Sequence, residues 1–177
     1  MSELATTSSR APKRPAVEVD ENQYLTFSVA GERFAVGILD IQEIIELSLM
    51  TALPLAPEFI RGVFNLRGGV VPVVDLAVRL GKEPSELTKR SCIVVVEITG
   101  KRRQTIGMLV DEVNEILDIL PDQMQPAPHL GDGRRAELLK GMGRIGEQFI
   151  VVLDIRHVLS IEDRVVLEQI VEQGLPG

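Results

Sequence analysis

Short apolar segments, separated by glycine, proline and charged turns, dominate the chain from Tyr24 onward. The clearest of them read YLTFSV, RFAVGI, VVPVVDL, CIVVVEI, TIGMLV and QFIVVLDI. Their length, their content of β-branched residues and the turn-forming residues that bound them are typical of strands. The pattern therefore predicts a mostly β chain.

Helical patterns are few. A proline in a plausible first turn predicts a short helix within residues 57–64. A second short helix is predicted over residues 76–80, ended by Gly81, and the charge and apolar spacing of residues 162–173 predict a terminal helix. Residues 1–20 are rich in Ser, Thr, Pro and charge and lack periodicity, so we expect a disordered N-terminal tail there.

The sequence contains an internal repeat. Residues 60–80, IRGVFNLRGGVVPVVDLAVRL, align without a gap with the segment that starts at Leu139, LKGMGRIGEQFIVVLDIRHVLS. A second, looser pair begins at Gly37 and Gly107 and closes with residues 43–46 matched to 115–118. Two copies of one strand order predict two similar sheets, and closed barrels would leave the fewest exposed sheet edges.

Composition and charge narrow the class of function. The chain is 45% hydrophobic but only 3% aromatic and has no Trp, so its core must be built from branched aliphatic residues. The net charge of −7 argues against nucleic acid as a partner, because phosphate binding depends on clustered Lys and Arg. Neither a secretory signal nor an apolar stretch of about 20 residues is present, which predicts a cytoplasmic protein without membrane insertion.

Residues suited to catalysis or metal binding are sparse. His129, in the loop-like PAPHLGDG, and His157, after VLDIR, lack metal-type spacing to other ligands. Cys92 begins an apolar run and is expected to be a small buried core residue. The repeated Asp75 and Asp154 each follow an apolar strand, where an aspartate can cap the next short helix. We therefore expect no enzyme, no bound metal and no cofactor.

Three segments resemble the CheW family of chemotaxis coupling proteins: FAVGILDIQEII, FIRGVFNLRGGVVPVVDL and LLKGMGRIGEQFIVVLDI. The resemblance runs from about residue 24 to residue 159. It implies two intertwined SH3-like five-stranded β-barrels, in agreement with the repeat. We expect this double barrel over residues 21–160, the first barrel at about 36–90 and the second at 24–35 plus 91–160, with exchanged strands. Residues 161–177 would form a C-terminal helix or tail.

The resemblance also implies a function. It predicts a non-catalytic adaptor at receptor arrays beneath the inner membrane. Its partners would be the cytoplasmic tip of a methyl-accepting chemoreceptor and the regulatory domain of a CheA-type histidine kinase. An adaptor of a related system, such as twitching motility, is an alternative. A small β-barrel that binds a ligand or nucleic acid is less well supported, because neither an apolar pocket with convergent polar groups nor a basic aromatic face is visible.

By this resemblance, the receptor-binding positions fall on Ile41, Glu43, Gly62, Arg67, Gly68 and Ile116. The isoleucines can offer apolar contact to a helix face, and the glycines allow a backbone to pass close to a partner. Arg67 adds a planar group of several donors that can fix a carboxylate in one orientation. We predict that Glu43 and Arg67 approach each other across the first barrel, because a charged pair would orient the arginine.

Overall fold

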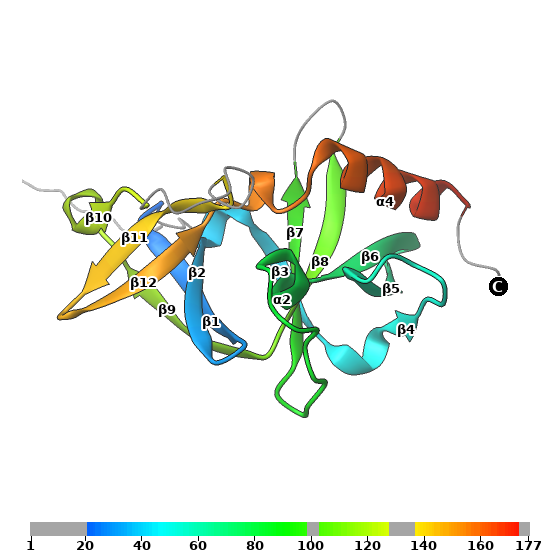
Figure 1. Ribbon diagram of the computed structural model, residues 1–177, viewed down its shortest axis with the longest axis horizontal. Coiled ribbons are helices and arrows are strands. Elements are labelled where there is room, and N and C mark those ends of the chain that lie inside the picture. The colour runs from blue at the N-terminus through cyan, green and yellow to red at the C-terminus, as the bar shows by residue number, and fades with distance from the viewer. Residues whose placement is uncertain (1–20, 99–102, 128–136, 174–177) are drawn as a thin grey trace, which may run out of the picture.

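In the computed structural model, the structure describes residues 21–98, 103–127 and 137–173. They form two β-barrels side by side, with short helices between and beside them (Figure 1). Each sheet contains five longer strands and one strand of two residues. The mostly β fold and the duplicated, intertwined barrels predicted above are therefore confirmed. The predicted N-terminal tail, residues 1–20, and His129 lie outside the described residues.

Barrel one has the strand order β3-β7-β8-β6-β5-β4 and barrel two the order β9-β1-β2-β12-β11-β10. The strands of barrel one are β3 (Ile41–Glu46), β4 (Thr51–Ala52), β5 (Ile60–Leu66), β6 (Gly69–Asp75), β7 (Cys92–Ile98) and β8 (Gln104–Val110). Those of barrel two are β1 (Gln23–Val29), β2 (Glu32–Gly37), β9 (Glu112–Asp118), β10 (Met124–Gln125), β11 (Leu139–Ile145) and β12 (Gln148–Leu153). The two orders correspond strand for strand, as expected for two copies of one unit.

The two copies exchange their first hairpins. The hairpin β1–β2 precedes β3 in the chain but completes barrel two, where β2 runs parallel to β12. In the same way β7–β8 completes barrel one, where β8 runs parallel to β6. We expected residues 91–110 in the second barrel, whereas β7 and β8 pair with strands of the first. The repeat identifies equivalent segments, but it does not say which copy each hairpin joins.

The largest apolar core lies between the barrels. It is built mainly by β1 and β2 from one side and by β7 and β8 from the other. Along β7, Val94 and Val96 face this shared core, whereas Ile93 and Val95 fill the interior of barrel one. Both faces of β7 are therefore buried, which explains the uninterrupted apolar run CIVVV. A smaller cluster around Ile119 and Val152 fills barrel two.

The helix predicted within residues 57–64 is wrong. Residues 60–66 form β5, and the turn before it is closed by a hydrogen bond from Ile60 N to Pro57 O of 2.9 Å. Pro57 would suit a first helical turn, but pairing with β4 and β6 lets the segment bury Ile60, Val63 and Phe64. Tertiary pairing here overrides the local signal.

The other two predicted helices are present as α2 (Leu76–Arg79) and α4 (Ile161–Gln173). Asp75 caps α2 by accepting a hydrogen bond from Ala77 N at 3.0 Å, and Gly81 follows at φ +82°. Ser160 and Asp163 exchange hydrogen bonds of 3.1 Å at the start of α4, which is a capping box. Within the described residues there are also four single turns of 3₁₀ helix: η2 (Ile38–Asp40), η3 (Leu47–Leu49), η4 (Pro121–Gln123) and η5 (Ile155–His157).

Cys92, at the start of β7, is only partly buried and packs against the edge of the shared core. The cysteine contacts the core, as predicted, but is less buried than expected. Burial, reinforced by the nearby carboxylates of Glu112 and Glu46, raises the pKa of the Cys92 thiol, although a backbone hydrogen bond from Val113 acts in the opposite direction. Because the thiolate is the reactive form, this thiol is a poor nucleophile at neutral pH.

Candidate functional site

Glu43 and Arg67 form an ion pair at the surface of barrel one. Arg67 Nη2 lies 2.8 Å from Glu43 Oε2, with the glutamate on β3 and the arginine in the turn between β5 and β6. The predicted approach of these two residues is confirmed. The side chain of Arg67 remains 73% exposed and that of Glu43 is 30% exposed. The carboxylate therefore orients the guanidinium, which keeps other donors free for a partner.

The turn that carries Arg67 is a tight two-residue turn with an unusual backbone. Arg67 has φ +51° and Gly68 has φ +85°, and Gly68 N donates to Asn65 Oδ1 at 3.1 Å. The left-handed region at both positions is typical of hairpin turns of this length. Gly146, at φ +64°, occupies the position of Arg67 in the matching turn of barrel two. At position 67, an arginine with positive φ costs about 1 kcal/mol in backbone strain relative to glycine. Such strain is typical of functional positions.

Contacts and backbone conformation within the chain explain why glycine occupies positions 62 and 68. A Cβ atom added to Gly62 would clash with Thr51 O, because β4 pairs with β5 at this point and the two backbones lie close together. A Cβ atom on Gly68 would meet nothing within 4 Å, so that residue is required by its positive φ. Gly62 thus shapes the edge of the barrel, and Gly68 shapes the turn that presents Arg67.

The two isoleucines lie on different barrels. Ile41, on β3, is half-buried and packs against the shared core, whereas Ile116, on β9, is 53% exposed. Five of the six predicted positions therefore belong to barrel one, and Ile116 belongs to barrel two. Ile44, which the repeat aligns with Ile116, was not among the predicted positions and is 44% exposed. Its side chain lies on the opposite face of β3 from that of Glu43, because successive side chains of a strand alternate.

Barrel two carries a related pair. Glu115, the repeat equivalent of Glu43, lies 3.2 Å from Arg33 on β2. Arg33 also donates to Thr26 Oγ1, which in turn donates to the carbonyl of Glu115 at 2.8 Å. On each barrel, an outer strand therefore presents an ion-paired glutamate next to an exposed isoleucine. The arginine comes from a turn in barrel one and from a strand in barrel two.

The repeated aspartates are structural, as predicted. Asp75 is fully buried and accepts hydrogen bonds from Arg61, Ser85 and Ala77. Its counterpart Asp154 accepts from the backbone and side chain of Arg156. Burial alone would raise the pKa of Asp154, but the hydrogen bonds and charge of Arg156 hold it below its ordinary value. Each carboxylate lies at the end of a strand and caps the helical turn that follows it.

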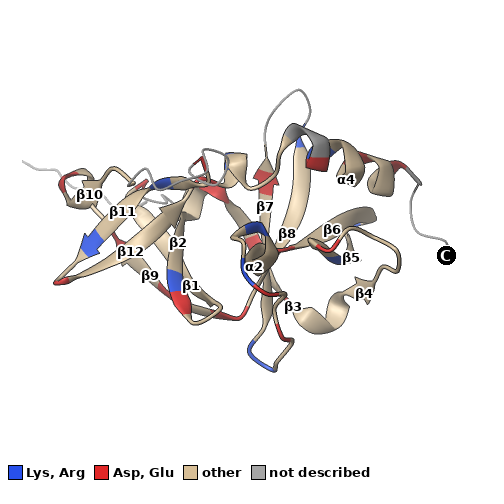
Figure 2. Ribbon diagram, viewed as in Figure 1, with Lys and Arg blue, Asp and Glu red and all other residues tan. Residues whose placement is uncertain are grey.

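Figure 2 shows that the described Lys and Arg residues are spread along both barrels and alternate with Asp and Glu. In the same part of the chain, no group of three or more His, Cys, Asp or Glu side chains could hold a metal ion. His157 Nδ1 lies 3.3 Å from Asp154 Oδ2 at a half-exposed position. None of the helices in the described segments combines the length and the apolar content needed to cross a bilayer.

Comparison with known proteins places these features in a family. The model of the CheW-like domain matches residues 23–163. The chemotaxis protein CheW of Klebsiella aerogenes is 31% identical over 170 residues, which cover 96% of this chain and 98% of that relative. The probable chemotaxis protein CheW of Rhizobium etli is 32% identical over 140 residues, or 79% of this chain and 88% of that relative.

A solved structure shares the architecture. The crystal structure of the scaffolding protein TtCheW from Thermoanaerobacter tengcongensis matches with a TM-score of 0.71 and 29% sequence identity. The match covers 81% of this chain and 96% of that one, so it includes both barrels rather than one of them. The chain therefore belongs to the CheW-like family of scaffold and adaptor proteins.

Proposed function

We propose that this protein is a non-catalytic adaptor that couples the cytoplasmic tips of methyl-accepting chemoreceptors to a CheA-type histidine kinase, within arrays beneath the inner membrane. The observation that carries the proposal is the exposed guanidinium of Arg67, which Glu43 orients at 2.8 Å. Membership of the CheW-like family and the likeness to a scaffolding protein support an adaptor role.

The surface around Arg67 suits a helical partner. The guanidinium can donate two parallel hydrogen bonds to a carboxylate on the surface of such a helix. Contacts of this kind give modest affinity one at a time. An adaptor held by several partners at once gains strength from their combined attachment, so weak individual contacts are compatible with a stable array.

Replacing Arg67 with alanine tests this proposal. We expect the variant to bind a soluble fragment of a chemoreceptor tip at least about tenfold more weakly than the wild type, because a charge-assisted hydrogen bond contributes about 1.5–3 kcal/mol. Isothermal titration calorimetry would measure the affinity. The free energy of unfolding of the Arg67→Ala variant should differ from that of the wild type by less than about 1 kcal/mol, since exposed ion pairs contribute little to stability.

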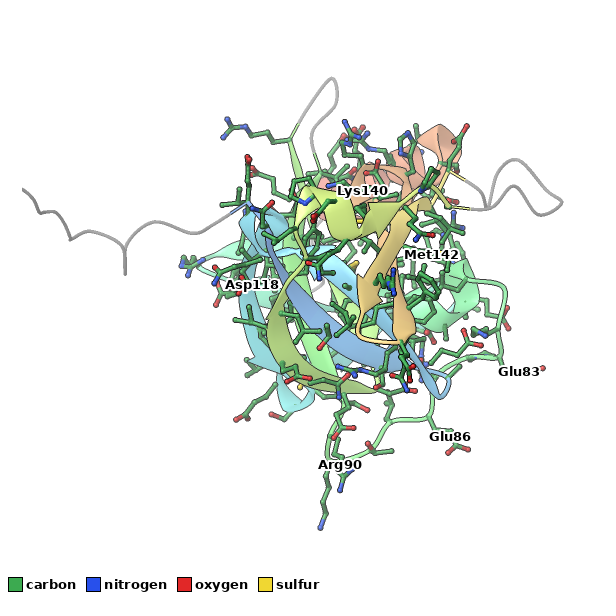
Figure 3. The ribbon with its side chains drawn as sticks, turned by 90° about the vertical axis from the view of Figure 1, so that its left-hand side faces the viewer. Glu83, Glu86, Arg90, Asp118, Lys140 and Met142 are labelled. Carbon is green, nitrogen blue, oxygen red and sulfur yellow. The ribbon has the colours of Figure 1, made fainter. Side chains whose placement is uncertain are left out.

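Arg90→Ala is the matched control. Arg90 is 77% exposed and pairs with Glu112 at 3.4 Å, so its setting resembles that of Arg67. It points away from both barrels (Figure 3). This variant should bind the receptor fragment like the wild type. Equal losses in the two variants would argue against a specific role for Arg67. If the wild type binds neither the receptor fragment nor the kinase regulatory domain at micromolar concentrations, the proposed function is wrong.

A further inference from the structure

The turn between β5 and β6 holds Arg67 in a conformation that arginine rarely adopts. Leu66 and Gly69 form the last pair of the two strands, so Arg67 and Gly68 alone make the turn. Both have a positive φ, of +51° and +85°, as a two-residue turn of type I′ requires. Glycine, asparagine and aspartate suit the first position of this turn, whereas a longer side chain is strained there. A further contact that favours this conformation would offset the strain.

Asn65, the residue before Leu66 on β5, provides such a contact. Its Oδ1 accepts a hydrogen bond from Gly68 N at 3.1 Å. Among the described residues, this is the only hydrogen bond of the Asn65 side chain, which is exposed. Either group could bond to water instead, so the bond is not needed to satisfy a buried polar atom. Its main effect is to favour the backbone conformation of the turn.

Two other hairpin turns in the described part of the chain follow the same rule. The β1–β2 turn, Ala30 and Gly31, also has a positive φ at both positions, +52° and +81°. There Asp111 Oδ2 accepts a hydrogen bond from Ala30 N at 2.8 Å. In the β11–β12 turn Gly146 alone has a positive φ, and no described side-chain oxygen accepts from either amide of that turn. A side-chain acceptor thus accompanies the two turns whose first residue is not glycine.

Arg67 is therefore held at both ends. The bond from Gly68 to Asn65 sets the backbone of the turn, and so the direction in which the Arg67 side chain leaves it. Glu43 Oε2, 2.8 Å from Arg67 Nη2, holds the guanidinium at the other end. Another type of turn would change the direction of the Cα–Cβ bond of Arg67, and with it the distance to Glu43. The backbone bond and the ion pair act together on the position of one exposed side chain.

We propose that Asn65 is a positioning residue for the receptor contact of Arg67. The inference rests on the proposed function and deepens it, because it gives a share in the affinity to a residue that need not touch the receptor. A side chain that is held in its binding conformation before the partner arrives loses less conformational entropy on binding. The acceptor on Asn65 therefore strengthens binding through Arg67 and contributes little by itself.

Asn65→Ala, made both in the wild type and in the Arg67→Ala variant, tests the inference. In the wild type, we expect binding of the receptor-tip fragment to weaken about fivefold, because a hydrogen bond that favours the bound conformation is lost. In the Arg67→Ala variant, the same change should alter the affinity less than about 1.5-fold. Asn65→Asp keeps an acceptor in the same place and should bind within about twofold of the wild type.

A spectroscopic readout and a control variant distinguish positioning from a general loss of structure. In NMR relaxation measurements on the free protein, the Nε–Hε order parameter of Arg67 should fall in Asn65→Ala and recover in Asn65→Asp. Arg144→Ala is the control, because Arg144 takes the place of Asn65 in the repeat and its Nε donates to Gly146 O at 3.3 Å. This variant should leave both the receptor affinity and the order parameter of Arg67 unchanged.

The outcomes separate the two proposals. If Arg67→Ala weakens receptor binding while Asn65→Ala does not, the inference is wrong and the proposed function stands. Equal losses from Asn65→Ala with and without Arg67 would also overturn the inference, since Asn65 would then act independently of the arginine. A wild-type protein that does not bind the receptor fragment would overturn the receptor half of the proposed function. The order parameter of Arg67 would still show whether Asn65 positions that side chain, so the two failures are distinguishable.

Discussion

Replacing Asp75 with alanine is expected to lower the free energy of unfolding by about 3 kcal/mol. Asp75 is fully buried, and its carboxylate accepts from Arg61 Nη1 at 2.7 Å and from the backbone and hydroxyl of Ser85 at 2.9 Å. It also caps α2 through Ala77 N. Its removal would leave several partly buried donors without an acceptor and would free the loop that follows α2. Urea unfolding followed by circular dichroism would measure the loss.

Asp154→Ala is the matched control in barrel two. Asp154 occupies the same place in the repeat and caps η5, but its main partner, Arg156, is 68% exposed and can turn to solvent. We expect a loss of about 1 kcal/mol, the usual effect of removing a cap. Because the pKa of Asp154 is lowered in the folded protein, its contribution is present above pH 3.8 and disappears as the pH falls through the folded pKa. If Asp154→Ala lowered the free energy of unfolding as much as Asp75→Ala, the deeper burial of Asp75 would not explain its larger expected effect.

Gly62→Ala is the second change with a large expected effect. The added Cβ would clash with Thr51 O and lie 2.9 Å from Met50 Cγ, so β4 must move away from β5. We expect a loss of about 2 kcal/mol in the free energy of unfolding, as is typical of overpacked sites. Hydrogen exchange should also become faster at the amides of Thr51 and Ala52, which pair with Val63 and Gly62.

Gly68→Ala separates crowding from backbone strain. Nothing lies within 4 Å of its added Cβ, but φ is +85°. The expected loss is about 1 kcal/mol, with exchange in β4 unchanged. If Gly62→Ala left both the stability and the exchange of β4 unaltered, the close pairing of β4 with β5 would not explain why glycine occupies position 62. A direct contact with a partner would then be the better explanation.

Much of the fold could be predicted because the repeat and the strand pattern describe the same architecture. The aligned segments that begin at Ile60 and Leu139 became β5–β6 and β11–β12, with the same bulge before Gly62 and Gly141. The hairpin exchange could not be predicted in detail, because pairing between distant strands is decided by tertiary contacts. The failed helix at residues 57–64 has the same cause, since pairing on both sides of β5 outweighed a favourable proline.

The candidate site was predictable where charge and turn chemistry act locally. The sequence NLRGG indicated a turn, and the match of Arg67 with Glu43 followed from the family resemblance and the complementary charges. A cavity between barrel one and α4 could not be predicted in this way either, because residues about 100 positions apart, such as Val70 and Val171, line it. The local role of Gly62 was also hidden, since the sequence does not show that β4 pairs with β5 at that point.

The exchanged hairpins have a consequence for how an adaptor could transmit a stimulus. The chain passes between the barrels through the few residues between β2 and β3 and between β8 and β9, and the largest core lies on that same boundary. A hinge motion would have to open this core, which is far costlier than bending a linker. The molecule should therefore move as one rigid body. If a partner tilts the protein at the Arg67 turn, Ile116 on the other barrel must move with it. The orientation of the adaptor, rather than a change in its conformation, would then carry the signal.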